Sequence, residues 1–331
     1  MKPLSIVIPT ANDPKLLQTA LESVARQTAV HAVEEVIVSE NSGRRDSEKV
    51  CAQFPDLPIT YICHERPLPI LEHFLYVYRQ ARAEFVAFLC DDDWWAPGHL
   101  QSALAGLHQH EDAVVSFSAC LYLDSEAARH GWISRVSVLW LAAGKPDLMK
   151  RWYLTPQEVL AVSALISVFH LSTMVVRREA LLRAAQTVDQ AHPRQFDQYL
   201  YVGLAREGAI LYDPLVDTFI RWNGTTNYSA GISMREREVA SRACTERIWR
   251  DAEAAGLDLT ATWQHHIAQA PADVLDEVGQ YFRIAMTNEQ LVERGFARFL
   301  PPPLPIRLAR RGRQFSTRAW RYLRRELLTL Q

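Results

Sequence analysis

The first third of the chain alternates short apolar runs with amphipathic segments. Five runs of strand length consist mainly of apolar residues: 4–8, 36–39, 59–63, 85–90 and 114–118. Between them, apolar residues recur every three or four positions, which is the spacing of helices that bury one face. Apolar strands separated by such helices are typical of a parallel sheet that is covered on both faces. The pattern therefore predicts an α/β fold with a mostly parallel sheet and helices on both faces.

After residue 120 the pattern becomes less regular. Residues 123–150 predict loops with some helix. Beyond them we expect a helix followed by a strand over 155–176, a helix over 196–207, and strands at 210–212 and 216–221. From about 233 to 298 the spacing is helical. We therefore expect three regions: a domain over 1–230, a C-terminal helical region over 231–300, and a proline linker with a basic amphipathic tail over 301–331.

One segment has the length of a membrane span. Residues 159–176 are 18 residues without a charge. They include polar side chains, among them Ser163 and His170, and we interpret His170 as a core residue. The preceding Thr155-Pro156-Gln157-Glu158 is typical of the start of a helix in a water-soluble domain. We therefore favour a buried helix followed by a strand over a membrane span.

Composition narrows the class of protein. Hydrophobic residues make up 48% and charged residues 22% of the 331, which excludes a disordered chain, a collagen and a coiled coil. The five cysteines form no CxxC pair, so they argue against a zinc site and a disulfide framework. The apolar run at 4–8 is too short for a signal peptide. We expect a cytoplasmic protein.

The formal net charge of -2 hides an uneven distribution. Residues 301–331 carry eight arginines and one acid, so the remaining residues have a net charge of -9. On a helix, Trp320 and Leu323 lie on a different side from Arg321 and Arg325. Such a helix fits an anionic membrane surface on the inner leaflet or the surface of a protein, and the sequence leaves both open. No segment resembles a base-reading module, so we expect no nucleic-acid partner.

An acidic triplet follows the apolar run at 85–90. Asp91, Asp92 and Asp93 stand where the carboxyl end of a parallel strand places ligand-binding residues. Adjacent carboxylates repel, and Mg²⁺ or Mn²⁺ removes that cost while binding phosphate oxygens. The alternative is an acidic loop that caps the next helix. We favour a site for a metal and a diphosphate; the lack of a glycine-rich loop disfavours a dinucleotide-binding or P-loop site.

Several segments together resemble family 2 glycosyltransferases with the GT-A fold. The resemblance covers residues 4–229. Its motifs are Ser5–Asn12 with Leu21–Val24, Glu35–Ser42, Ala83–Trp94 with the DxD-like triplet, and Phe196–Gly208. The family implies an inverting transfer from a nucleotide-diphospho-sugar to a hydroxyl group of a glycan or lipid-linked acceptor. It also favours a role in the assembly of cell-surface polysaccharide or lipopolysaccharide.

The resemblance also implies roles for single residues. The nucleotide would contact the ends of three strands, at Pro9, Thr10, Asn12, Glu40, Asn41, Asp91 and Asp92. The metal ion, Mg²⁺ or Mn²⁺, would be held by Asp91, Asp92 and Asp93. Asp197 would remove the proton from the acceptor hydroxyl, as a general base does.

This chain departs from the family pattern at three positions. Glu40 replaces the usual aspartate, and Cys90 stands where an acid is frequent, which leaves open which of the three aspartates binds the metal. Asn223 occupies the place of a histidine and is a candidate contact for the diphosphate or the metal. Two alternatives also stay open: a catalytically silent member that binds a nucleotide or glycan, and a metal-dependent nucleotidyltransferase.

Overall fold

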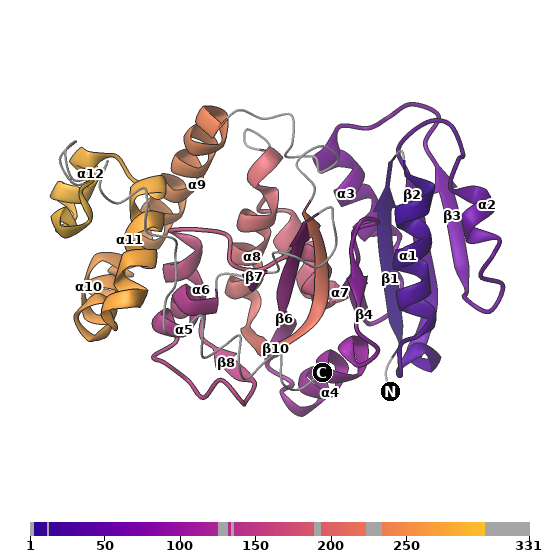
Figure 1. Cartoon of the computed structure of the whole chain (residues 1–331), viewed down its shortest axis with the longest axis horizontal. Coiled ribbons are helices and arrows are strands. Elements are labelled where there is room, and N and C mark those ends of the chain that lie inside the picture. Colours follow the sequence, from indigo (N-terminus) through magenta and orange to yellow (C-terminus); the bar gives the residue numbers. More distant parts are fainter. Residues whose placement is uncertain are drawn as a thin grey trace. The chain divides into compact units, whose positions relative to one another are not determined.

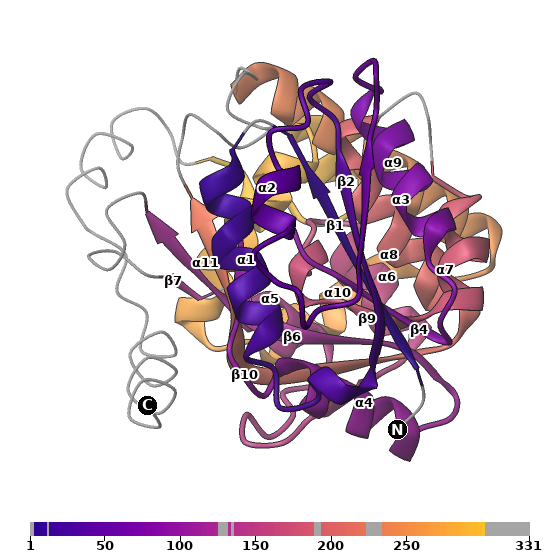
Figure 2. The same cartoon turned by 90° about the vertical axis from the view of Figure 1, so that its right-hand side faces the viewer.

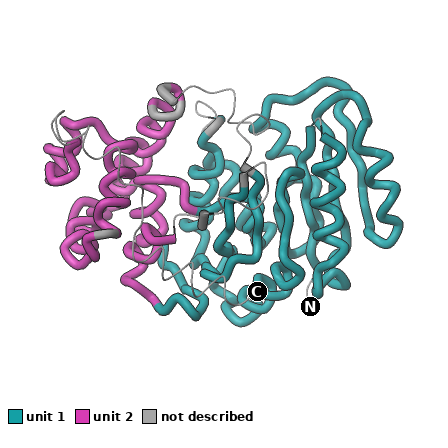
Figure 3. The backbone as a smooth tube through the Cα atoms, in the orientation of Figure 1, with its two compact units in different colours: residues 1–134, 147–156, 169–231 teal, residues 135–146, 157–168, 232–331 magenta. Residues whose placement is uncertain are grey.

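The computed structural model describes residues 3–11, 13–124, 132–133, 136–188, 193–222 and 234–301. Two compact units make up the chain (Figure 3). Unit 1 consists of residues 1–134, 147–156 and 169–231, and unit 2 of residues 135–146, 157–168 and 232–331.

Unit 1 is built on one mixed sheet (Figures 1 and 2). Four parallel strands occupy one side in the order β3-β2-β1-β4; they are β1 (Leu4–Thr10), β2 (Val33–Glu40), β3 (Ile59–Cys63) and β4 (Phe85–Phe88). The sheet continues as β9-β6-β10-β5, with β9 (Val175–Arg177), β6 (Ala113–Asp124), β10 (Ala209–Trp222) and β5 (Trp94–Trp95). β9 runs antiparallel to β4 and β6, whereas β6 and β10 are parallel. The predicted α/β fold with a mostly parallel sheet is confirmed.

Short antiparallel strands were not predicted. β5, β7 (Trp132–Ile133) and β8 (Trp152–Leu154) have two or three residues each, too few for a periodic pattern. β10 is one strand where we predicted two, and its register against β6 shifts between Asp213 and Val216. Pro214 lies in this irregular part, and proline cannot donate a backbone hydrogen bond to the ladder.

Helices cover both faces of this sheet, as predicted. One face carries α1 (Pro14–Ala25), α2 (Glu48–Cys51) and α4 (His99–Gln109), and the other carries α3 (Ile70–Gln80), α7 (Arg178–Ala185) and α8 (Phe196–Glu207). Alternate residues of β1, including Ile6 and Ile8, share a buried cluster with Leu17 of α1 and Leu104 of α4. α1 is capped by Asp13, whose carboxylate accepts hydrogen bonds from two backbone N–H groups of the first turn.

Unit 2 is helical in its described part. It contains α5 (Val136–Ala142), most of α6 (Pro156–Ser163), α9 (Met234–Ala254), α10 (Leu259–Gln269), α11 (Ala272–Ala285) and α12 (Asn288–Glu293). Two buried indoles connect α9 and α10 to α6 and the residue after it. Trp249 of α9 donates a hydrogen bond to the carbonyl oxygen of Ala164, and Trp263 of α10 donates one to the carbonyl oxygen of Ala161. Phe282 packs against the Trp263 ring. These contacts pack α9, α10 and α11, which lie in the region of helical spacing, against one another and against α6.

Residues 159–176 form a helix and then a strand, in the order that we favoured. α6 ends at Ser163, a short 3₁₀ turn, η2, covers Leu171–Thr173, and β9 begins at Val175. Within the described parts of the chain, no helix combines the length and the apolar character that crossing a bilayer requires.

Candidate active site at the strand ends

The ends of β1 and β4 meet at the acidic triplet. β4 is fully buried, and the chain passes from it through Leu89 and Cys90 to Asp91. The Thr10 hydroxyl at the end of β1 donates a hydrogen bond of 2.5 Å to Asp91 Oδ2, and the backbone N–H of Ala11 donates one of 3.3 Å to the same oxygen. Two residues predicted for one site, Thr10 and Asp91, are therefore in direct contact, and Pro9 lies beside them in β1.

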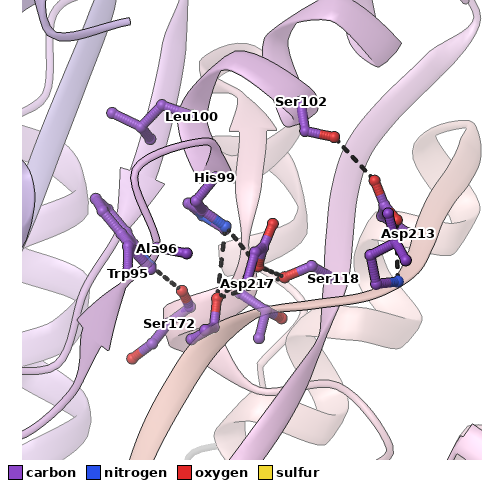
Figure 4. A network of polar contacts seen from close by, with 12 residues as sticks. Trp95, Ala96, His99, Leu100, Ser102, Ser118, Ser172, Asp213 and Asp217 are labelled. Atoms are coloured by element: carbon purple, nitrogen blue, oxygen red, sulfur yellow. Dashed lines mark hydrogen bonds and ion pairs between the residues drawn. The ribbon is translucent and has the colours of Figure 1, made fainter. Parts of the chain in front are cut away.

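Asp93 is the most deeply fixed acid of the triplet. Its side chain is 1% exposed. The Ser172 hydroxyl donates 2.5 Å to Oδ2, and the backbone N–H of Arg221 in β10 donates 3.1 Å to Oδ1. Ser172 also accepts the backbone N–H of Cys90 at 3.0 Å and receives the Trp95 indole N–H on its carbonyl oxygen at 2.6 Å (Figure 4). Residues of η2 and β10 therefore hold in place the acidic loop, by which we mean residues 90–93 after β4.

A second group of polar side chains, His99, Asp217 and Ser118, adjoins Trp95, the residue two positions after the acidic triplet. The Trp95 ring stacks on His99, with ring centroids 4.7 Å apart. His99 Nδ1 lies 2.9 Å from Asp217 Oδ1, and the Ser118 hydroxyl donates to that same carboxylate (Figure 4). Among the described residues, His99 Nε2 is buried and has no hydrogen-bond partner, so the imidazole is held through its Nδ1 side and through the stacked indole. The network links the base of the acidic loop to β6 and β10.

His170 also lies beside the triplet. Its Nδ1 accepts the backbone N–H of Ser172 at 3.3 Å and is 3.7 Å from Asp93 Oδ2. Burial lowers the pKa of His170 to about 4, so the imidazole is neutral at pH 7. The sequence indicates only a core position for His170, and it does not indicate the contact of Ser172 with Asp93, because a serine within an apolar run carries no signal of its partner.

Three side chains have the spacing of a cation site. Among the residues that the structure describes, the Cys90 sulfur and one carboxylate oxygen each of Asp92 and Asp93 lie within 4.8 Å of one another. Asp91 lies outside this group, and its carboxylate contacts β1 instead. Carboxylate oxygens suit Mg²⁺ and Mn²⁺, and a thiolate suits softer divalent ions. The donor set therefore fits a divalent cation.

The electrostatics of the triplet also favour a cation. Burial, and next the charge of Asp92, raise the pKa of Asp91 to about 7. Burial also raises the pKa of Asp92, and burial together with the charge of Asp92 raises that of Asp93 well above its usual value. The pKa of the Cys90 thiol is raised as well, by burial and then by the charges of Asp93 and Asp92. Ionised carboxylates here are costly unless a positive charge compensates them.

These shifts predict how stability depends on pH without metal. A carboxyl with a raised pKa binds its proton more tightly in the folded protein, so Asp91 destabilises the fold as pH rises from about 4 to about 7. The largest loss that this shift allows is roughly 4 kcal/mol. We expect urea unfolding in EDTA to show a smaller loss over this window for Asp91→Asn than for the wild type. Equal pH dependence of the two proteins would contradict the shift.

Glu40, at the end of β2, is buried and organises the loop that follows. Its carboxylate accepts hydrogen bonds from the hydroxyls of Ser42 and Tyr61 and from the backbone N–H groups of Asp46 and Ser47. Burial raises the pKa of Glu40, but the hydrogen bonds from Ser42, Tyr61 and Ser47 outweigh burial and hold it below its ordinary value. The contact of Glu40 with the base or ribose stays a prediction.

Asn41 fixes a second loop against the strand ends. Its side-chain amide donates to the carbonyl oxygen of Leu68 at 2.9 Å and accepts the N–H of Leu68 at 2.7 Å. Its own backbone N–H donates to the carbonyl oxygen of Thr10. Asn41 thereby places the loop before α3 next to the end of β1, where we predicted the nucleotide.

Asp197 lies in the first turn of α8 and is partly exposed. Burial raises the pKa of Tyr78, and the charges of Cys90 and Asp197 raise it further; the same two charges act on Tyr201. Asp197 and Tyr201 are four residues apart on α8 and share one side of it. Asp197 and Cys90 therefore lie within electrostatic reach of the same two buried tyrosines. Asn12 and Asn223 lie outside the described residues, as do residues 302–331.

The chain resembles known glycosyltransferases in sequence and in structure. The sequence model of Glycosyl transferase family 2 matches residues 5–181. A crystal structure of S. aureus TarS 1–349 with UDP-GlcNAc has a TM-score of 0.57 at 16% identity, and the match covers 89% of this chain and 87% of that one. The TarS complex with UDP has a TM-score of 0.54 at 16% identity, covering 92% and 77%. At this identity the likeness shows the GT-A fold alone. No curated protein sequence matches the chain.

Proposed function

The chain belongs to glycosyl transferase family 2, and from this premise we propose that it is an inverting transferase that moves a sugar from a nucleotide-diphospho-sugar to a hydroxyl group. The observation that carries the proposal is the contact between the β1 end and the acidic loop after β4. This contact joins Thr10 to Asp91, beside the group of Cys90, Asp92 and Asp93. Family and fold support a glycosyltransferase; the inverting course and the acceptor are our proposal.

On the donor side, hydrogen bonds within the protein already hold Asp91, Asp93 and Asn41 among the candidate residues that the structure describes. Negative charge develops on the diphosphate as its bond to the sugar breaks, and a divalent cation bound at the acidic loop would stabilise that charge. Asp92 and Asp93, with Cys90, are the residues that would hold it. Asp93 already accepts hydrogen bonds from Ser172 and from the Arg221 backbone, so the loop needs little reorganisation. Pro9, Thr10, Asn12, Glu40, Asn41, Asp91 and Asp92 would contact the nucleotide, and Asn223 the diphosphate or the metal.

On the acceptor side, Asp197 is our candidate for the general base. A hydroxyl group is a weak nucleophile, and a carboxylate that takes its proton during attack accelerates transfer by ~10² to 10⁴. Attack from the face opposite the leaving group inverts the anomeric carbon. Asp197 comes from α8, whereas the candidate cation ligands follow β4, so the base and the diphosphate site belong to separate elements.

Binding of nucleoside diphosphates is the first test of this function. We expect a panel of them to raise the melting temperature in Mn²⁺ but not in EDTA. Since TarS was crystallised with UDP, UDP heads the panel. A ligand that binds only the folded state at a hundredfold excess over Kd adds about 2.7 kcal/mol of stability. A panel without any metal-dependent shift would argue against the proposed donor site.

We further propose that the protein acts in the cytoplasm in the assembly of a cell-surface polysaccharide or lipopolysaccharide, with residues 307–331 on an anionic membrane. Each basic residue near such a surface contributes about 1 kcal/mol, and salt screens this attraction.

The membrane proposal predicts the result of a truncation. Deleting residues 307–331 should abolish sedimentation with anionic liposomes and leave nucleotide binding intact. Replacing Trp320 and Leu323 together with Ser should reduce sedimentation without changing the melting temperature. A lower melting temperature with unchanged sedimentation would show instead that the segment packs on the protein.

A further inference from the structure

The candidate cation site contains a sulfur atom. Cys90 is the residue immediately before the acidic triplet, and its backbone N–H donates to the Ser172 hydroxyl that also contacts Asp93. Its Sγ and one carboxylate oxygen each of Asp92 and Asp93 lie within 4.8 Å of one another. Cys51, Cys120 and Cys244 are buried, and no other described cysteine belongs to such a group.

The three donors of this group are not equivalent. Both oxygens of Asp93 already accept hydrogen bonds, from Ser172 and from the Arg221 backbone. A cation bound by these three side chains competes with the two hydrogen-bond donors for the carboxylate of Asp93. Asp92 and Cys90 therefore contribute a larger part of the metal–ligand bonding. The identity of the residue at position 90 should therefore influence which cation binds.

We infer that Cys90 Sγ is a direct ligand of the cation at this site, and that the site therefore prefers thiophilic divalent ions over Mg²⁺. The inference rests on the proposed function, because it names the ion class of that same site. Hard oxygen-only sites suit Mg²⁺, whereas a thiolate strengthens binding along the series from Mn²⁺ to Co²⁺ and also for Zn²⁺ and Cd²⁺. Binding forms a metal–sulfur bond and releases the thiol proton to solvent, with no change of oxidation state.

Cadmium reports sulfur ligation directly, because a cadmium–thiolate bond absorbs in the ultraviolet. The experiment titrates Cd²⁺ into the full-length, reduced and EDTA-stripped protein. We expect one equivalent of Cd²⁺ to produce the charge-transfer band in the wild type. The band should disappear in Cys90→Ser, and its Cd²⁺ affinity should fall at least about tenfold, since even outer contacts of a metal site cost that much.

Cys63→Ser is the matched control, because Cys63 is a partly exposed thiol outside the group and could bind Cd²⁺ adventitiously. The band should persist in this variant. A band that survives in Cys90→Ser, or that is lost in Cys63→Ser instead, would overturn the assignment. Cys90→Asp provides a second variant that keeps three donors: it should also lose the band, and Mg²⁺ should compete better against Mn²⁺ than in the wild type.

Failure of this inference is distinguishable from failure of the proposed function. If nucleotide-sugar turnover is present and the wild type gives no band, the cation site lacks sulfur and the function stands. If the band depends on Cys90 and no nucleotide-sugar is turned over, the sulfur ligand stands and the proposed activity is wrong.

Discussion

Replacing Asp92 with Asn should abolish the metal-dependent part of nucleoside diphosphate binding and lower turnover by at least ~10³-fold. A cation stabilises the charge of a leaving diphosphate by several kcal/mol, and each 1.36 kcal/mol is tenfold in rate. Asp92 is the best single target, because its carboxylate is one of the three candidate cation ligands. Asp91 and Asp93 also hold the loop through hydrogen bonds to β1, η2 and β10. Asparagine keeps the shape of the side chain and removes its charge.

The measurement is calorimetric titration of the nucleotide in Mn²⁺ and in EDTA, together with turnover. Asp56→Asn is the control, since it removes one carboxylate from an exposed position just before β3, away from the carboxyl ends of the strands. It should match the wild type in both measurements. Equal wild-type affinity in EDTA and in Mn²⁺ would show that the donor site does not depend on a cation.

Replacing Asp197 with Asn should separate catalysis from binding. Asparagine keeps hydrogen-bonding capacity but cannot accept the acceptor proton, so kcat should fall by at least ~10²-fold while donor affinity stays within about twofold. Glu207→Gln removes a carboxylate from the other end of the same helix and serves as the control. Full turnover in Asp197→Asn would assign the base to another acid and would show that the match of residues 196–208 to the family motif is misplaced.

The sequence predicted the strands whose two faces are both covered. Ile6, Val38 and Phe85 stand in apolar runs because helices pack on both sides of the sheet, and this pattern is visible without partners. β5 and β8 depend on pairing with β10, which lies far away in the chain, and they are too short for periodicity. The same holds for the continuous β10, where an irregular register bridges the position of Pro214.

At the candidate site, the sequence indicates the three acids but not the residues that hold them in place. Asp91 to Asp93 are candidates because three carboxylates after a buried strand need a compensating charge. Ser172 and Arg221 are not, because they reach Asp93 from 79 and 128 residues further along the chain. Cys90 departs from the family pattern, and the structure adds that its sulfur lies within 4.8 Å of a carboxylate oxygen of Asp92 and of one of Asp93.

The proposed function is tested most directly by determining which bond of the nucleotide-diphospho-sugar is broken. The full chain is incubated with Mn²⁺ and a panel of nucleotide-diphospho-sugars in water labelled with heavy oxygen, and slow transfer to water is followed by mass spectrometry. We predict that at least one donor yields an unlabelled nucleoside diphosphate and a labelled sugar, and that Asp92→Asn does not produce them. Labelled phosphate products from cleavage within the diphosphate, or no product from any donor, would contradict a glycosyltransferase with its donor site at these strand ends.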